Sequence, residues 1–264
     1  MLVHIIADYG HGDLAGAEVV QRLKRSLPDA EPLFTPVPPF ATLAAGFCIA
    51  QLGLNDAPTN TLIYHNVAPR ADDPTVRSHN AGERLAFARL PTGVRVIGVN
   101  AGYAFAFVRD VAEEFRWAAA AASGSQFRSR DLFPQIASAI VLGQPESLAD
   151  SIPPAEIPDI PPHHITYIDG YGNLKTTIKH GTLDAPCGTS LRVRIGTVEH
   201  EAVLSDGSFA VESGQLAVAP GSSGWPLPAG QETRWMEIFW RGSNAWEAFG
   251  RPAIGACIAL RDMV

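Results

Sequence analysis

The feature that most constrains the fold is a proline-rich segment just past the middle of the chain. Between residues 145 and 162 proline occupies six positions, including the pairs Pro153-Pro154 and Pro161-Pro162. Proline has no backbone N–H and a fixed φ, so this segment is not expected to form a regular helix or a central strand. It predicts an extended linker, residues 145–162, between two domains, residues 1–144 and 163–264.

Before the linker, apolar runs typical of buried strands alternate with stretches whose apolar residues recur at helical spacing. The alternation predicts an α/β domain whose helices cover both faces of a mainly parallel sheet. A ligand site is then expected outside the carboxyl ends of the strands, near the domain junction. The predicted strands are residues 2–7, 62–64 and 94–99, and the predicted helices are residues 14–27, 41–52, 107–121 and 130–143.

After the linker, short apolar runs are separated by Gly, Asp and Ser. This pattern predicts an all-β domain that resembles a small barrel. The predicted strands are residues 164–168, 191–195, 200–204, 215–218, 235–239 and 256–260.

Composition narrows the class of protein. Apolar residues make up 46% of the chain and charged residues 18%, which is the composition of a globular protein. The net charge is −7 and no cluster of Lys and Arg is found, so the sequence offers no basic face for binding nucleic acid. No apolar run is long enough to span a bilayer, and the N-terminus lacks the basic start of a signal peptide. The cysteines Cys48, Cys187 and Cys257 form no metal or disulfide pattern. We expect a cytoplasmic protein without a membrane or nucleic-acid partner.

Asp8 follows the first predicted strand directly, in the motif Asp8-Tyr9-Gly10. An ionised carboxylate can accept two hydrogen bonds at once, which suits the vicinal 2′- and 3′-hydroxyls of a ribose. The alternative is that Asp8 caps the helix or turn that follows. The spacing of Asp8, His11 and Asp13 matches no established metal motif, and no metal is predicted.

Asp8 belongs to the first of three segments that share an order and spacing with a known family. They resemble the S-adenosylmethionine (SAM)-cleaving enzymes that include the SAM hydroxide adenosyltransferases, the fluorinase and the chlorinase. The resemblance implies that Asp8 binds the ribose, that Tyr9, Ser129 and Asp131 line the ligand site, and that SAM is the substrate with no further cofactor. It also implies a homotrimer with sites between subunits. The segments are Ile6-Ala7-Asp8-Tyr9-Gly10, residues 129–137 (SRDLFPQIA) and residues 167–174 (YIDGYGNL).

The family's hydrolytic residues fall on different residue types in this chain. Asn66 stands where the family has an aspartate, Arg128 stands where it has a histidine, and the family's arginine corresponds to Arg70 or Arg77. In the hydroxide-transferring members, the Asp, Arg and His position and activate a water that attacks ribose C5′. A neutral amide and a guanidinium cannot act as a general base at ordinary pH.

Several interpretations of this site stay open. The nucleophile is an anion attracted by Arg128, the site binds without turnover, or a nearby base such as His65 or His79 replaces the histidine. Arg128 is alternatively a surface cation, and Asp131 an N-cap. The lead prediction is cleavage of SAM at C5′ to adenosine and methionine; the alternatives are a catalytically silent SAM- or adenosine-binding protein and transfer to another anion such as halide.

The third segment is expected to complete the ligand site from the second domain. The resemblance implies that Asp169 meets the methionine ammonium, that Tyr171 stacks near the adenine, and that Asn173 hydrogen-bonds it. The alternative is a hairpin turn, which Asp-Gly between strands commonly forms. Farther along, the resemblance adds Ser222, Ser223 and Glu237 to the ligand-binding residues, although residues 226–234 look like an insertion between them.

Overall fold

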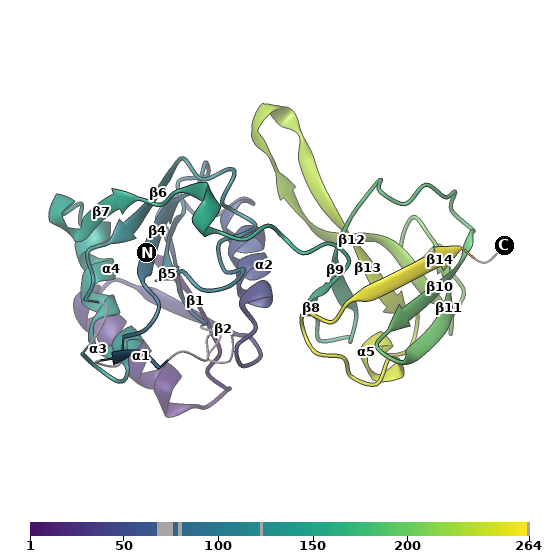
Figure 1. Ribbon diagram of the computed structural model, residues 1–264, viewed down its shortest axis with the longest axis horizontal. Coiled ribbons are helices and arrows are strands. Elements are labelled where there is room, and N and C mark those ends of the chain that lie inside the picture. Colours follow the sequence, from purple (N-terminus) through teal and green to yellow (C-terminus); the bar gives the residue numbers. More distant parts are fainter. Residues whose placement is uncertain (68–75, 79–80, 122–123, 263–264) are drawn as a thin grey trace. The chain divides into compact units, whose positions relative to one another are not determined.

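The computed structural model describes residues 1–67, 76–78, 81–121 and 124–262. It divides into two compact units, Met1–Asp159 and Ile160–Val264 (Figure 1). The first unit extends past the predicted boundary at residue 144, because β7 (Leu148–Ser151) pairs with β6 (Glu114–Ala118) at the edge of the sheet. The prolines of this segment flank β7 instead of interrupting it, so a short edge strand forms inside the predicted linker.

The sheet of the first unit has seven strands in the order β2-β1-β3-β5-β4-β6-β7. Its β2-β1-β3-β5 half is parallel, and the pairings of β4 with β5, β4 with β6, and β6 with β7 are antiparallel. The prediction of a mainly parallel sheet is therefore wrong, and the sheet is mixed. The reason is a tight turn at Leu90–Val94, with Gly93 at φ 83°, that joins β4 and β5 as a hairpin. The other strands are β1 (Leu2–Ala7), β2 (Glu31–Pro36), β3 (Thr61–Asn66), β4 (Leu85–Arg89) and β5 (Arg95–Val99).

Helices cover both faces of this sheet, as predicted (Figure 1). One face packs against α1 and α4, which share an apolar core with the inward side chains of β1, β3 and β5. The short helix α3 lies beside α1 and α4. The other face packs against α2, whose side chains are mostly buried on all sides. The helices are α1 (Leu14–Ser26), α2 (Thr42–Gly53), α3 (Arg128–Asp131) and α4 (Phe133–Val141), with 3-10 turns η2 (Pro145–Ser147) and η3 (Pro154–Glu156).

The predicted helix over residues 107–121 is absent. The chain instead makes turns up to residue 111 and then enters β6. Within β6, Phe115 and Trp117 are residue types that favour strands, and they pair with Ala88 and Ala86 of β4. Pairing with a strand that sequence reasoning had not identified therefore overrides the helical spacing.

Gly46 marks the place where α2 meets the turns that follow β5. A Cβ built on Gly46 would lie 2.3 Å from the carbonyl oxygen of Tyr103 and 3.1 Å from the ring of Phe107. Alanine in an open helix stabilises by about 0.5–1 kcal/mol over glycine, but here the methyl group would overlap backbone. We expect Gly46→Ala to lower the free energy of unfolding by about 2 kcal/mol in urea titrations. Gly10→Ala, where a built Cβ meets no atom within 4 Å, is the control, and equal stability of both variants would contradict this packing.

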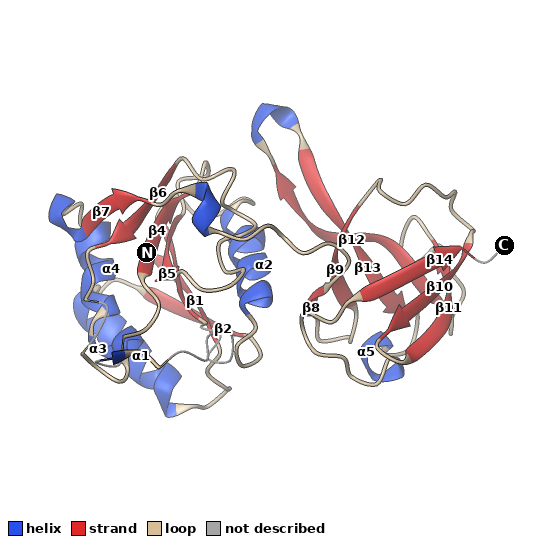
Figure 2. Cartoon of the chain, viewed as in Figure 1, coloured by secondary structure: helices blue, strands red, loops and turns tan. Residues whose placement is uncertain are grey.

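The second unit is an all-β structure, as predicted (Figure 2). Its seven strands follow the order β14-β10-β11-β12-β13-β9-β8, antiparallel except between β11 and β12. A bridge between His164 and Cys257 brings the two edges together, so the sheet curls into a barrel-like form. The elements are β8 (Ile165–Ile168), β9 (Leu174–Lys179), β10 (Ser190–Ile195), β11 (Val198–Leu204), β12 (Leu216–Pro226), η4 (Pro228–Gly230), β13 (Glu232–Trp240), α5 (Ala245–Ala248) and β14 (Ile258–Asp262).

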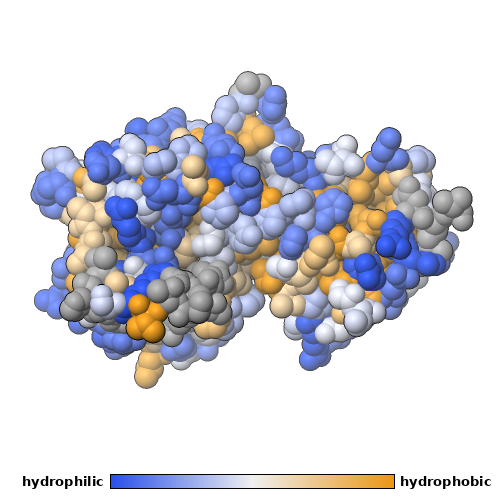
Figure 3. All heavy atoms as spheres, viewed as in Figure 1, coloured by the Kyte–Doolittle hydropathy of each residue, from blue (hydrophilic) through white to orange (hydrophobic). Residues whose placement is uncertain are grey.

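On the face drawn in Figure 3, hydrophilic residues cover most of the surface of the first unit. Within the described residues, no helix has both the length and the apolar character that crossing a membrane requires.

Candidate functional site

Asp8 and Asn66 lie side by side at the carboxyl ends of β1 and β3. Ala7, the last residue of β1, is paired with Asn66, the last residue of β3, and Asp8 follows Ala7 directly. The Oδ2 atom of Asp8 accepts a hydrogen bond of 3.1 Å from the backbone N–H of Phe40. The N-cap of α1 is Asp13, which accepts from the N–H of Ala15 at 2.9 Å. Asp8 therefore does not cap α1, and its carboxylate lies where a ligand of the sheet edge would meet it.

Phe40 is a contributor that sequence reasoning missed. Its φ of 63° is in the left-handed region, which is strained for a side chain other than glycine. The hydrogen bond to Asp8 helps to hold this conformation, and the ring is 46% exposed. Strained residues of this kind concentrate at functional sites. The sequence carried no signal for the strain, because proline and aromatic residues in a loop do not specify a positive φ.

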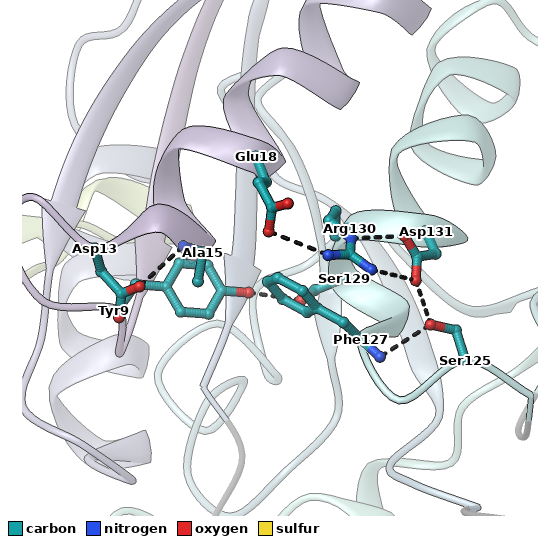
Figure 4. A network of polar contacts seen from close by, with 9 residues as sticks. All are labelled: Tyr9, Asp13, Ala15, Glu18, Ser125, Phe127, Ser129, Arg130 and Asp131. Carbon is teal, nitrogen blue, oxygen red and sulfur yellow. Dashed lines mark hydrogen bonds and ion pairs between the residues drawn. The ribbon is translucent and has the colours of Figure 1, made fainter.

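A buried hydrogen-bond network joins this edge of the sheet to α3 (Figure 4). The hydroxyls of Tyr9 and Ser129 lie 2.6 Å apart, and Tyr64 donates to the carbonyl oxygen of Ser129 at 2.5 Å. Burial raises the pKa of Tyr9, and hydrogen bonds to Ser129 and to the side chain of Asn66 partly oppose that shift. The predicted residues Tyr9, Asn66 and Ser129 are therefore brought together, although they are far apart in the chain.

Arg128 is the first residue of α3, directly before Ser129, but its side chain contacts other residues than Ser129 does. Its guanidinium packs against Gly82, where a Cβ would lie 1.9 Å from Nη2, and stands 5.3 Å from the ring centroid of Phe133. Burial lowers the pKa of Arg128, the Glu83 carboxylate opposes that effect, and Arg77 adds to it. Arg77 pairs with Glu83 at 2.9 Å. Among the predicted catalytic residues, Arg77 and Arg128 thus converge on Glu83.

Two predicted residues are not placed, and a third is in the interior. Arg70 and His79 lie outside the described residues. His65 is fully buried and packs edge-on against Phe105, with ring centroids 5.3 Å apart. Burial lowers the pKa of His65 to about 4, and a polar contact with the Val99 backbone opposes that shift. Its place inside the unit does not suit a base that must reach a substrate.

Asp131 takes part in a network that links α3 to α1 (Figure 4). Arg130 donates to both of its carboxylate oxygens, at 2.7 and 3.0 Å, and also pairs with Glu18 of α1 at 3.1 Å. The Arg130 guanidinium and the hydroxyl of Ser125 lower the pKa of Asp131 to about 2. The N-cap of α4 is Leu132, so the N-cap alternative for Asp131 is wrong. This network holds α3, and with it Ser129, in place.

In the second unit, Asp169 organises the turn between β8 and β9. Its Oδ1 atom accepts from the N–H groups of Tyr171 and Asn173, at 2.9 and 3.0 Å. Its Oδ2 atom accepts from the side-chain amide of Asn173 at 3.0 Å and lies 3.4 Å from Nζ of Lys175. A carboxylate has about four acceptor positions, and three of them accept hydrogen bonds from within the turn, while the Lys175 ammonium balances the charge. The hairpin-turn alternative is thus what the structure shows for Asp169, while Tyr171 is 81% exposed.

Glu237 and the segment around Ser222 lie beside this turn. Lys175 donates to the Oε2 atom of Glu237 on β13, so one ammonium contacts both predicted carboxylates. An irregularity of β12 between Pro220 and Gly224 contains Ser222, which is exposed, and Ser223, which is buried. Residues 226–234 are the end of the β12–β13 hairpin. Lys175 lies just past the segment that carries the resemblance, residues 167–174, and was not among the predicted residues.

The described candidate residues form two clusters, one in each unit. The first unit contains those around Asp8 and Ser129, and the second unit contains those around Asp169 and Glu237. Within the described residues, no group of three His, Cys, Asp or Glu side chains is arranged to hold a metal ion.

Comparison with other proteins supports the fold. No family model matches the chain, and no curated protein matches it. An uncharacterized conserved protein from Thermotoga maritima has a similar structure, with a TM-score of 0.75, 18% identity, and coverage of 98% of this chain and 100% of that one. A conserved hypothetical protein from Thermus thermophilus gives a TM-score of 0.67, 21% identity, and coverage of 98% and 99%. The chain shares their fold over nearly its whole length.

Proposed function

We propose that the chain binds SAM at the carboxyl ends of β1 and β3 and cleaves it at ribose C5′, giving adenosine and methionine. The observation that carries this proposal is the convergence of Asp8, Asn66 and the Tyr9–Ser129 pair at that edge of the sheet. Asp8 presents a carboxylate suited to the two ribose hydroxyls. The sequence resemblance to SAM-cleaving enzymes supplies the reaction.

Much of the catalysis of this reaction can come from alignment of the nucleophile, and activation by a base adds to it. The sulfur of SAM is cationic, so methionine leaves readily, and the protein must mainly align a nucleophile with C5′ and exclude bulk water. In this proposal Asn66 orients the nucleophile by hydrogen bonding, and Arg128 with Arg77 provides positive charge that retains an anionic or polarised nucleophile. The same resemblance leads us to propose a homotrimer with sites between subunits. Sedimentation at the mass of three 28.2 kDa chains would support it.

The second candidate is nucleoside binding without cleavage. It is favoured by Asn66 and Arg128, neither of which can accept a proton at ordinary pH. It is also favoured by Asp169, whose acceptor positions are used within the chain by Tyr171, Asn173 and Lys175. A methionine ammonium would have to compete with these groups for that carboxylate.

One experiment separates these candidates. Purified protein is incubated with SAM, with and without chloride, and the products are resolved by chromatography, beside calorimetric titrations with SAM and with adenosine. Adenosine and methionine as products support cleavage. Binding without product supports the second candidate. A 5′-chloro nucleoside that appears only with chloride would instead support transfer to halide, and absence of both binding and product would refute all three.

Asp8→Ala is expected to weaken adenosine binding by about 10- to 100-fold, because two charge-assisted hydrogen bonds to the ribose are lost. Asp8→Asn keeps an acceptor for the N–H of Phe40, so it separates loss of the ribose contacts from collapse of the loop. Asp13→Ala removes the cap of α1 and is the matched control for a lost carboxylate. Calorimetry measures all four proteins. Unchanged affinity in Asp8→Ala, or equal loss in Asp13→Ala, would contradict the site.

A further inference from the structure

The candidate site contains a carboxylate that none of its motifs includes. Glu83 lies two residues before β4, and β4 runs antiparallel to β5, with Leu85 opposite Val99. The start of β4 therefore lies at the same end of the sheet as the carboxyl ends of β1, β3 and β5. The N–H of Asn100, just after β5, donates to the carbonyl oxygen of Arg84 at 2.9 Å, which fixes this position. A wholly parallel sheet would not have brought Glu83 here.

Glu83 pairs with one cation of the candidate site, and its charge acts on a second. Its Oε1 atom lies 2.9 Å from Nη1 of Arg77, and its charge acts on the guanidinium of Arg128. Arg128 reaches this position because Gly82 leaves room for its guanidinium. The side chain of Glu83 is 28% exposed, so it is partly buried yet reachable by water. Arg77 acts as a positioning residue for this carboxylate, and Arg128 adds a positive charge that acts on it.

Glu83 lies at the same edge of the sheet as Asn66, the residue proposed to orient the nucleophile. In the order β1-β3-β5-β4, it is two strands away from Asn66, which corresponds to about 10 Å along the edge of the sheet, and three strands away from the end of β1, which Asp8 follows. On the opposite side, Arg128 is followed directly by Ser129, which contacts Tyr9. Glu83 is thus linked through Arg128 and Ser129 to Tyr9, which follows Asp8 in the chain.

We propose that Glu83 is the general base of this site, taking the role that Asn66 and Arg128 cannot fill. The inference rests on the proposed function, cleavage of SAM. The oxygen of a water molecule bonds to C5′ while the C5′–S bond breaks and its electron pair goes to sulfur. The water's proton passes to the Glu83 carboxylate and then to solvent. The products are adenosine, methionine and one proton.

The test compares Glu83→Gln, Glu83→Asp and wild type for SAM turnover and for adenosine affinity. Glu83→Gln keeps the size but cannot accept the proton, so kcat is expected to fall about 100-fold or more while the adenosine Kd stays unchanged. Glu83→Asp is expected to restore part of kcat. Glu114→Gln is the control, because Glu114 makes similar ion pairs, with Arg89 and Arg116, at the other end of β4.

The outcomes distinguish this inference from the function on which it rests. Wild-type kcat in Glu83→Gln overturns the role of Glu83 and leaves cleavage intact. Loss of adenosine binding together with turnover assigns Glu83 to binding or folding and also overturns its role as base. A wild-type protein that binds adenosine and never cleaves SAM overturns both the reaction and the inference.

Discussion

Lys175→Met is expected to lower the free energy of unfolding of the second unit by about 3 kcal/mol. Lys175 is 8% exposed and contacts the carboxylates of Asp169 and Glu237, whose side chains are 21% and 12% exposed. Removing one partner of a buried ionic group leaves the other charges uncompensated, which typically costs about 3–5 kcal/mol. The partial exposure of Asp169 places the expected value at the lower end. Urea unfolding followed by tryptophan fluorescence measures it.

Two further variants make this prediction specific. Lys179→Met removes an exposed lysine from the same strand and is expected to change stability by less than about 0.5 kcal/mol. Combining Lys175→Met with Asp169→Asn and Glu237→Gln removes the unpaired charges and is expected to recover most of the loss, since residues in one network do not act additively. If Lys175→Met were as stable as wild type, or if the triple variant were less stable than Lys175→Met alone, charge compensation would not be what stabilises the Asp169–Lys175–Glu237 cluster.

The stability of the first unit is expected to fall by about 3 kcal/mol between pH 6.5 and pH 4 because of His65. In the unfolded chain its pKa is the ordinary value of about 6.5, and burial lowers the folded pKa to about 4. The folded state therefore favours the neutral ring. As the pH falls below 6.5, the unfolded chain takes up a proton that the folded chain does not, so stability is lost until the folded pKa is reached. Each pH unit in this window corresponds to about 1.4 kcal/mol.

Comparison of wild type with His65→Leu in urea titrations from pH 7.5 to pH 4 isolates this effect. The pKa of His4 is also lowered by burial, so the variant is expected to keep a smaller slope of the same sign. The pKa of Asp131 is also lowered by folding, so its stabilising effect is likewise lost as the pH falls. That loss occurs mostly below pH 4, because the unfolded pKa of Asp131 is near 3.8. Parallel pH profiles for the two proteins would mean that His65 is protonated as readily when folded as when unfolded.

The elements that could be predicted are those whose signal is local. The strand before Asp8 and the helix after it were both found, because apolar periodicity acts within one segment. The pairing of β6 with β4 depends on a strand about thirty residues away, and no local pattern encodes such a partner. Phe115 and Trp117 were accordingly assigned to a helix.

The same distinction applies to the candidate site. Asp8, Asn66 and Ser129 could be named as candidates because each stands in a recognisable segment, and the structure places them near one another. Glu83 could not be named, because its place at this edge of the sheet follows from the direction of β4, which depends on the topology of the whole sheet. The ion pair of Asp169 with Lys175 could not be predicted either, because it depends on how the β8–β9 hairpin folds.

The pairing of Asp169 with Lys175 also changes what ligand binding at that turn would mean. A ligand ammonium that took the place of the Lys175 ammonium would exchange one cation for another. The free energy of such an exchange is the difference between two similar ion pairs, and the number of charges on the protein side is unchanged. At this turn, a cationic ligand would therefore gain little selectivity from its charge and would depend on the fit of its uncharged parts.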